Sequence, residues 1–379
     1  MSTLKTTNLQ HASAASPAIV LDANSRATLN GLSYPTEGSL SGRNRIINGA
    51  MVVDARNAGA SVTPTASVYS MDRWQIAISQ SSKLSFQQNA GSVTPPAGFS
   101  NYLGITSLSS YSVAAGDYFL INQFIEGFNT ADLAWGTASA SAVTLSFWVR
   151  SSLTGTFGGC LDNDGNARSY PFSYTISAAN TWEKKTITIA GDTSGTWLTN
   201  NGKGIGVRFS LGTGSTYTTT AGAWASGAYF NATGATSVVG TNGATFYITG
   251  VQLEAGSVAT PFERRSYGQE LMLCQRYFET SYPSGVAVGS IYEPAPTQHS
   301  ARTNEFRTWQ EFSVDKRTSA TVKFYSPTTG TVDKFRNRQT SADINIVADS
   351  ASTTGTRVSA NAGTAGDLIA WNYTAEAEL

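Results

Sequence analysis

The sequence predicts an all-β protein, and three observations support this prediction. The chain has 379 residues, enough for two or three domains. Only 13% of the residues are charged, 36 are Gly, and Ser, Thr and Ala are abundant. Such a composition is poor in helix formers and rich in turn formers and β-branched residues. Several stretches also alternate apolar and polar residues with the period of a half-buried strand.

Residues 1–43 form the first predicted segment. Residues 17–22 and 27–31 have strand-like sequences. Two short strands cannot bury a core by themselves. We therefore expect this segment to pair with copies of itself in an oligomer or to dock on another protein. A leader without fixed structure is the alternative.

Residues 44–262 are predicted to form one large β-sandwich, with long loops rich in Gly, Ser, Thr and Ala between its strands. In one predicted strand, residues 142–150, the apolar side chains alternate with polar ones, except that Trp148 stands on the more polar face. A second, residues 244–254, changes its alternation at Gly250, which predicts a β-bulge. The remaining expected strands span residues 68–77, 83–88, 117–125, 181–189 and 203–210.

Residues 263–379 form the third predicted unit, a helix followed by a β domain. Residues 261–379 hold 12 of the 25 basic and 13 of the 25 acidic residues of the chain, and this change in charge density indicates a domain boundary. Ser266 and Gln269 have the spacing of a capping box, which predicts a helix within residues 263–280. Residues 321–325, 344–348 and 368–373 are strand-like, and the chain ends in a polar tail.

Charge and hydropathy exclude several classes of partner. Basic and acidic residues are equal in number, so no general attraction to nucleic acid is expected. No apolar run approaches the length of a membrane-spanning helix. The first 20 residues do not resemble a secretory signal. Without export, Cys160 and Cys274 are expected to be two buried reduced thiols.

Several stretches, taken in order, resemble the layout of phage and prophage tail proteins. They are Leu4–Gln10 with Ala15–Pro17; Asn44–Met51, followed by Arg56–Asn57 and Asp72–Trp74; Gln123–Gly127; Leu145–Ser151; Val251–Glu263, continuing to Cys274–Tyr277; and Trp371–Leu379. The middle of the chain is also similar in layout to jelly-roll carbohydrate-binding modules.

This resemblance implies a tail fibre, a homotrimeric virion appendage made in the host cytoplasm. It would attach to other tail proteins through residues 1–43 and recognise a host-surface glycan, without membrane insertion. A capsid fibre or decoration protein with an architectural role is the first alternative. A glycan-degrading tailspike is the second.

Signals for catalysis are few, and we expect no enzyme. The chain has two histidines, His11 and His299, both in loop-like sequence, so a Ser-His-Asp or Cys-His arrangement is not expected. Glycan cleavage by paired carboxylates would need two acids a few ångströms apart. The pairs that lie close in sequence, Asp162 with Asp164 and Glu126 with Asp132, do not indicate such a site.

The run from Asp162 to Asn166 permits two interpretations. Asp, Asn and Gly tolerate positive φ, so the run is typical of a hairpin turn. Its oxygens also suggest calcium, but Ala167 and Ser173 stand where a calcium loop has Gly and Glu. No cofactor is expected, and a structural calcium elsewhere in the jelly roll stays open.

Aromatic side chains in loops are the candidate ligand-binding residues. Sugar rings stack their C–H faces on such side chains, while nearby polar groups bind the hydroxyls. The alternative is that the rings pack under their own loops or against another subunit, and Trp74 and Trp182 are expected in the core. The candidates for glycan binding are Tyr217, Trp224, Tyr229, Phe230, Trp197 and Tyr102.

Overall fold

The computed structural model describes residues 42–300, 303, 305–360 and 364–379, without the side chains of residues 347–349, and the backbone of four short strands before residue 34. These strands pair antiparallel in sequence order: β1 (Asn8–Leu9), β2 (Ile19–Leu21), β3 (Ala27–Leu29) and β4 (Leu32–Ser33). Two of them, β2 and β3, confirm the strands predicted in the leader. The other predictions for residues 1–41 lie outside the described residues.

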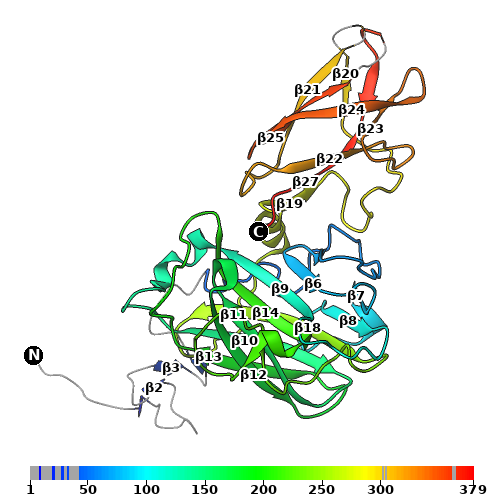
Figure 1. The fold of residues 1–379 in the computed structure, drawn as a ribbon. Helices are drawn as coiled ribbons and strands as arrows, with labels where there is room; N and C mark the ends of the chain where they lie inside the picture. The colour runs from blue at the N-terminus through cyan, green and yellow to red at the C-terminus, as the bar shows by residue number, and fades with distance from the viewer. Residues whose placement is uncertain are drawn as a thin grey trace, which may run out of the picture.

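Two antiparallel sheets form the central β-sandwich (Figure 1). The first has the order β13 (Glu183–Ile189), β10 (Val143–Ser151), β18 (Thr245–Ala255), β8 (Leu103–Ser107) and β7 (Leu84–Gln88). The second has the order β16 (Ala225–Ser226), β12 (Arg168–Ile176), β11 (Gly155–Asp162), β14 (Lys203–Thr213), β9 (Tyr118–Glu126), β6 (Trp74–Ile78) and β5 (Val68–Met71).

One apolar core lies between the two sheets. Phe147 on β10 and Phe209 on β14 come from opposite sheets, and their ring centroids are 4.9 Å apart, edge to face. Both side chains are fully buried, as are Leu145 and Val149 on the same face of β10. The apolar face of β10 thus lies in the core as predicted, but the expected alternation of burial is limited to its second half, because Thr144 and Ser146 on the other face are buried as well.

The bulge predicted at Gly250 is present. The pairing of β18 with β10 shifts between Ser146 and Trp148, and Gly250 has a φ of 61°. Because of this shift, the apolar side chains after Gly250 point into the core again, and Val251 lies there with Ile248. Trp148 is half-buried on the outer face.

The prediction of one strand over residues 68–77 was wrong. The segment is a hairpin of β5 and β6, with a turn at Asp72 and Arg73. Arg73 adopts a φ of 72°, which ends β5 and reverses the chain before Trp74. Trp74 is fully buried in the core, as predicted. The strands β8, β11 and β12 were not predicted.

Loops between the sandwich strands carry the remaining short elements. The strands β15 (Thr218–Thr219) and β17 (Asn231–Ala232) pair in parallel within the loop that follows β14. Five 3₁₀ turns lie in connections: η1 (Ala90–Ser92), η2 (Gly127–Asn129), η3 (Ala131–Leu133), η4 (Asp164–Asn166) and η5 (Ser215–Tyr217).

The helix α1 (Tyr267–Gln275) begins where the capping box predicts. The Ser266 hydroxyl accepts a hydrogen bond of 3.3 Å from the Gln269 backbone N–H. Cys274 on this helix and Cys160 on β11 are both buried and free, which confirms two buried thiols. No helix in the described part of the chain is long and apolar enough to cross a membrane.

The chain after α1 forms two further sheets around a second core. The first has the order β19 (Phe278–Thr280), β27 (Asn372–Glu376) and β22 (Thr321–Tyr325). The second has the order β20 (Thr297–His299), β26 (Leu368–Ala370), β23 (Lys334–Asn337), β24 (Ala342–Ala351), β25 (Gly355–Ala360) and β21 (Phe306–Glu311). Figure 1 shows these sheets beyond one end of the sandwich, with the C-terminal end of the chain at the junction.

Candidate functional site

The candidate site lies at the end of the sandwich where β9 and β13 end and where β10 and β14 begin. Residues 127–142 join β9 to β10, and residues 190–202 join β13 to β14. Val143 pairs with Ile189, and Lys203 pairs with Glu126. Antiparallel pairing therefore brings both connections to the same end of the molecule.

Three tryptophans from loops form one cluster at this end. The ring centroids of Trp135 and Trp197 are 4.6 Å apart, and Trp224 lies 5.3 Å from each. All three pairs meet edge to face, an arrangement that aromatic rings prefer. Trp197 and Trp224 were predicted from the sequence, but Trp135 was not. The same criterion, a tryptophan in a loop of small residues, would have found it.

Hydrogen bonds to loop carbonyls fix the three indoles. The Nε1–H groups of Trp135, Trp197 and Trp224 donate to the carbonyls of Ser141 (2.7 Å), Ser194 (3.1 Å) and Ala190 (2.7 Å). Each buried or half-buried indole therefore has its polar group satisfied within the protein, as a buried donor requires. The rings are held in place before any ligand arrives.

Asp192 joins the two connections. Its carboxylate accepts two hydrogen bonds of 2.7 Å from Nε and Nη2 of Arg168, and its carbonyl accepts a hydrogen bond of 2.7 Å from the Gly136 N–H. Bidentate contacts between an arginine and a carboxylate are among the stronger polar interactions. The hydrogen bonds from Arg168 to Asp192 raise the pKa of the Arg168 guanidinium. This ion pair anchors the wall of the site to β12.

A cavity of about 210 Å³ opens beside the tryptophans. Trp135 and Trp197 contribute to its wall, and Trp224 packs edge to face against both rings without lining the cavity. The other lining residues are three threonines, two alanines, a leucine and an isoleucine: Thr130, Thr137, Thr199, Ala131, Ala134, Leu198 and Ile205. Aromatic faces together with threonine hydroxyls can bind a ligand that is itself both apolar and rich in hydroxyls.

Two of the six aromatic candidates are buried, which contradicts their predicted exposure. Tyr102 is fully buried, donates its hydroxyl to the Ala90 carbonyl at 2.6 Å, and packs against Trp182 and Tyr247. Trp182, predicted to be a core residue, is instead half-buried. Long-range packing that the sequence pattern does not reveal covers the Tyr102 ring.

Phe230 is the other buried candidate, because it packs with Tyr217 over the outer face of the second sheet. Their rings stack with centroids 5.0 Å apart, and the Arg208 guanidinium lies 4.8 Å from the Phe230 centroid. Phe230 is only 6% exposed, whereas Tyr217 and Tyr229 are half-buried. The structure therefore brings Trp197 and Trp224 together, and it places Tyr217 and Phe230 in a separate cluster.

The run from Asp162 to Asn166 is a hairpin turn, as one of its two interpretations predicted. β11 and β12 pair antiparallel on either side of it, and Asn166 has a φ of 56°. The buried Asp162 carboxylate receives Arg208 Nε at 2.6 Å and lies 3.0 Å from Lys203 Nζ. These cations occupy the carboxylate that would have begun a calcium loop. No group of three or more potential metal ligands occurs in the described ranges.

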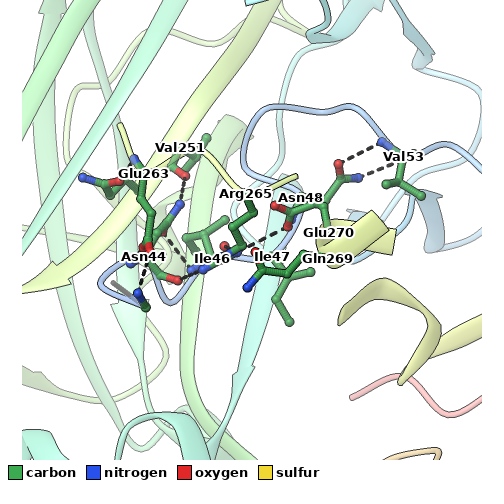
Figure 2. A network of polar contacts seen from close by, with 12 residues as sticks. Asn44, Ile46, Ile47, Asn48, Val53, Val251, Glu263, Arg265, Gln269 and Glu270 are labelled. Atoms are coloured by element: carbon green, nitrogen blue, oxygen red, sulfur yellow. Dashed lines mark hydrogen bonds and ion pairs between the residues drawn. The ribbon is translucent and has the colours of Figure 1, made fainter. Parts of the chain in front are cut away.

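Residues 44–53, which include the Asn44–Met51 motif, form a polar clasp (Figure 2). Asn44 accepts from the Leu253 N–H at 3.1 Å and donates to the Val251 carbonyl at 3.1 Å. The Asn48 N–H donates to Glu270 on α1, and Arg265 Nη1 donates to the same carboxylate at 3.3 Å. The clasp ties the start of the sandwich to its closing strand and to the helix.

Other motif residues lie at the junction between the sandwich and the C-terminal sheets. Arg276 donates to the Glu126 carboxylate at 2.6 and 2.9 Å, and the Tyr277 hydroxyl donates to it at 2.7 Å. Burial by itself raises the pKa of Glu126, but the hydrogen bonds from Arg276 and Tyr277 outweigh it and lower the pKa. Arg56 and Arg73 both pair with Glu378.

The end of the chain, predicted to be a polar tail, is instead partly buried against the sandwich. Ala377 is buried, and the Glu378 carboxylate is enclosed by two arginines. The Tyr69 hydroxyl donates to the Leu379 carbonyl at 2.8 Å. These buried partners come from the sandwich, more than 300 residues earlier in the chain, so the tail's own sequence does not reveal them.

His299 does not form part of a catalytic constellation in the described part of the chain. Its exposed ring has Nδ1 2.9 Å from the Gly366 carbonyl, on the β20 edge. His11 lies outside the described residues. The carboxylates of Glu126 and Asp162 are each bound to cationic side chains.

No family model matches this chain, and no curated protein matches it. Among solved structures, it is similar to the enzymatically active domain of tailspike protein 4 of bacteriophage CBA120, at 10% identity and a TM-score of 0.31. That match covers 56% of this chain and 21% of the tailspike chain, so it spans about a fifth of that chain's length.

Two sugar-binding proteins are also similar in structure. A putative sugar-binding protein from Bacteroides thetaiotaomicron matches at 11% identity and a TM-score of 0.33, over 56% of this chain and 100% of its own. A family 11 carbohydrate-binding module from Clostridium thermocellum, in complex with a mixed-linked tetrasaccharide, matches at 11% identity and a TM-score of 0.26, over 50% and 91%. These TM-scores are low, so the description of the fold depends on the strand pairing and the core of this chain and not on the similar structures.

Proposed function

We propose that this chain is a non-enzymatic tail fibre of a bacteriophage particle that binds a host-surface glycan through the Trp135–Trp197 cavity. The single observation that carries glycan binding is the convergence of two fixed indole rings on a cavity lined by threonines. A sugar ring presents C–H groups to an aromatic face and hydroxyls to neighbouring donors and acceptors. The chemistry of the wall and the chemistry of a sugar are therefore complementary.

The size of the cavity limits what it can hold. At about 210 Å³ it is smaller than pockets that enclose a whole drug-sized ligand, which typically measure roughly 300–1,000 Å³. We therefore propose that it takes one sugar unit, at a chain end or on a branch, while the rest of the polysaccharide remains outside.

The assignment to a virion tail rests on the ordered set of motifs in the sequence. In this proposal the protein is made in the host cytoplasm and assembles as a homotrimer. Residues 1–43 attach it to other tail proteins, and no cofactor takes part. An architectural fibre on the capsid and a glycan-degrading tailspike are the competing functions.

Replacement of Trp197 tests the binding site. The Trp197→Ala protein is expected to lose binding to immobilised host polysaccharide, because the cavity loses one of its two aromatic walls. Trp182→Ala is the matched control. It removes another half-buried indole, whose Nε1–H donates to the Thr94 carbonyl in a different cluster, and it should leave binding unchanged.

The outcomes separate the competing functions. Equal binding by the wild type and the Trp197→Ala protein would remove the cavity as the glycan site. Release of reducing ends from the polysaccharide by the purified protein would favour the degrading tailspike. Electron cryomicroscopy of the particle should reveal three copies at the tail, and density on the capsid shell would favour the architectural function.

A further inference from the structure

Three aromatic rings meet on the outer face of the first sheet of the sandwich. A Cβ atom on Gly250 would lie 2.6 Å from Cζ of Phe99, in the connection 89–102, and 3.1 Å from Cδ1 of Trp148, so these two rings meet over this glycine. The Phe99 ring also contacts Phe262 edge to face, with the ring centroids 5.1 Å apart. All three rings are half-buried, so part of each remains open to solvent.

The Arg264 side chain is held at one end of this row of rings. Its guanidinium lies 4.8 Å from the centroid of Phe99 and 5.8 Å from that of Phe262, a cation–π arrangement. A Cβ atom on Gly98 would lie 2.8 Å from Nη2 of Arg264, so the guanidinium also packs against this glycine. Arg264 is exposed, and no described residue accepts a hydrogen bond from it or forms an ion pair with it. The rings thus fix the cation, while its planar fork of N–H donors, which matches a carboxylate or a phosphate, remains available.

Two further cations lie on the same face beside Trp148. Lys184 on β13 pairs with Trp148 across the strands, which places their Cβ atoms about 4.5–5.5 Å apart. Lys184 is exposed and has no ion pair within the described ranges. Arg150 follows Trp148 by two residues and so shares its face. Its Nε donates to the Asn180 carbonyl at 2.9 Å, and its guanidinium lies 5.4 Å from the centroid of Tyr247, but no carboxylate of the described chain pairs with it.

Acidic side chains do not balance these cations. The segments 89–102 and 177–182, which border this face, contain no Asp or Glu. Nearby carboxylates are already bound: Glu183 forms an ion pair of 2.6 Å within β13, Glu263 accepts two backbone N–H groups, and Glu254 is buried and hydrogen-bonded. The face therefore has a local excess of positive charge, although the chain as a whole is neutral.

The groups between the cations suit a sugar. The Nε1–H of Trp148 and the exposed hydroxyl of Thr186, which lies two residues from Lys184 on β13, have no hydrogen-bond partner in the part of the chain that the structure describes. Sugar rings stack on aromatic faces, and their hydroxyls bind such donors and acceptors. Duplex DNA carries one charge per about 1.7 Å of its axis, a density that three separate cations match poorly. An acidic polysaccharide fits this face better.

We infer that the strip that runs from Lys184 over Trp148 and Phe99 to Arg264 is a binding site for an acidic polysaccharide. Sugar rings pack on the aromatic side chains, and the cations bind carboxylate or phosphate groups of the polysaccharide. This cationic strip shares no residue with the Trp135–Trp197 cavity, and the inference does not depend on that cavity.

The test uses the whole protein and an array of immobilised acidic bacterial polysaccharides, some with carboxylate and some with phosphate groups, beside neutral dextran and a single-stranded DNA oligonucleotide. The wild type is expected to bind at least one acidic polysaccharide, and less tightly as the salt concentration rises. Arg264→Gln and Lys184→Gln should each weaken this binding by about tenfold or more, the usual effect of losing a hydrogen bond to a charged group. Lys323→Gln is the matched control, because it removes the charge of an exposed lysine on β22.

The pattern among the variants decides the outcome. Weakened binding in both Arg264→Gln and Lys184→Gln but not in Lys323→Gln, with or without an effect of Trp197→Ala, supports the cationic strip. Affinity that is unchanged in either strip variant, or lowered equally in Lys323→Gln, overturns it, and a loss confined to Trp197→Ala leaves the cavity as the glycan site. Absence of binding to every acidic polysaccharide, or equal binding to the DNA oligonucleotide, also overturns the inference. Wild-type unfolding midpoints would show that each variant is folded.

Discussion

At the scale of single residues, Asp72 is a buried carboxylate with incomplete pairing. One of its oxygens accepts a hydrogen bond of 2.7 Å from the Ala55 N–H. The other has no hydrogen-bond partner among the described residues. Burial, which outweighs the attraction of Arg56, raises the pKa of Asp72 to about 6. The charged form is thus less favourable in the folded protein than in the unfolded chain.

This raised pKa predicts a pH dependence of stability. Between the ordinary pKa of 3.8 and about 6, the folded protein binds more protons at Asp72 than the unfolded chain does. The contribution of Asp72 to the free energy of unfolding therefore falls as the pH rises through this window. The Asp72→Asn variant should lack this contribution and should be more stable than the wild type at pH 7.

Urea unfolding at pH 4, 5, 6 and 7 measures this effect as the difference between the variant and the wild type. The difference is needed because Glu126 and Glu279 have lowered pKa values, which add the opposite slope in both proteins. Asp164→Asn, which removes an exposed carboxylate, is the control and should leave the slope unchanged. A difference between Asp72→Asn and wild type that does not change with pH would contradict the prediction.

The candidate site illustrates what single residues reveal before the fold is known. A tryptophan in a loop of small residues was a sufficient criterion for Trp197 and Trp224. The broader criterion, an aromatic residue in a loop, failed for Tyr102, because the residues that bury it, Trp182 and Tyr247, come from distant parts of the sequence. Whether a loop ring lines a cavity or packs beneath a loop depends on neighbours that local sequence does not specify.

At the scale of elements, the bulge in β18 depends on Gly250. This residue has a φ of 61°, and a Cβ atom there would come within 2.6 Å of Cζ of Phe99 and 3.1 Å of Cδ1 of Trp148. An alanine would therefore meet both backbone strain and a steric clash. Gly243 has a similar φ of 74° but no atom within 4 Å of the corresponding Cβ position.

These two glycines form a matched pair for mutation. Gly243→Ala should lower the free energy of unfolding by about 1–2 kcal/mol, the cost of left-handed backbone for an L-residue. Gly250→Ala should lower it by more, because Phe99 and Trp148 must also move. Urea unfolding measures both, and equal losses in the two variants would show that the contacts around Gly250 add no cost.

The strands β11 and β12 were not predicted, although the turn between them was, and the omission has a physical explanation at the same scale. Gly158 and Gly159 lower the expected strand tendency of this segment. In the fold, a Cβ atom on Gly159 would lie 2.0 Å from the Arg208 carbonyl oxygen of the neighbouring strand. Glycine here permits the close approach of another strand, so a residue type that usually argues against a strand is required within one.

At the scale of the whole molecule, buried ion pairs join the sandwich to the C-terminal sheets. Glu126 receives Arg276 and Tyr277, and Glu378 receives Arg56 and Arg73. Arg73 is almost fully buried and its guanidinium lies 3.5 Å from the centroid of the Tyr277 ring. Loss of one partner of such a buried pair leaves the other uncompensated, which costs about 3–5 kcal/mol.

We therefore expect the sandwich and the C-terminal sheets to unfold in one thermal transition. Glu126→Ala should lower the midpoint and split the transition in two, because Arg276 and Tyr277 lose their common acceptor at the junction. Scanning calorimetry measures both effects. Asp164→Ala, which removes an exposed carboxylate of the sandwich, is the control. A single transition at the wild-type midpoint in Glu126→Ala would contradict the coupling.

The sequence by itself determined the all-β class, six of the twelve strands in the two sandwich sheets, the bulge at Gly250 and the start of α1 at Ser266. Each of these depends on periodicity, backbone conformation or capping within a few residues, so local sequence contains the information. Only the tertiary structure decided that Trp135 joins Trp197, that Phe99 meets Trp148, and that Glu378 is buried between Arg56 and Arg73. Strand order and long-range pairing produce these contacts, because they bring together residues that lie tens to hundreds of positions apart.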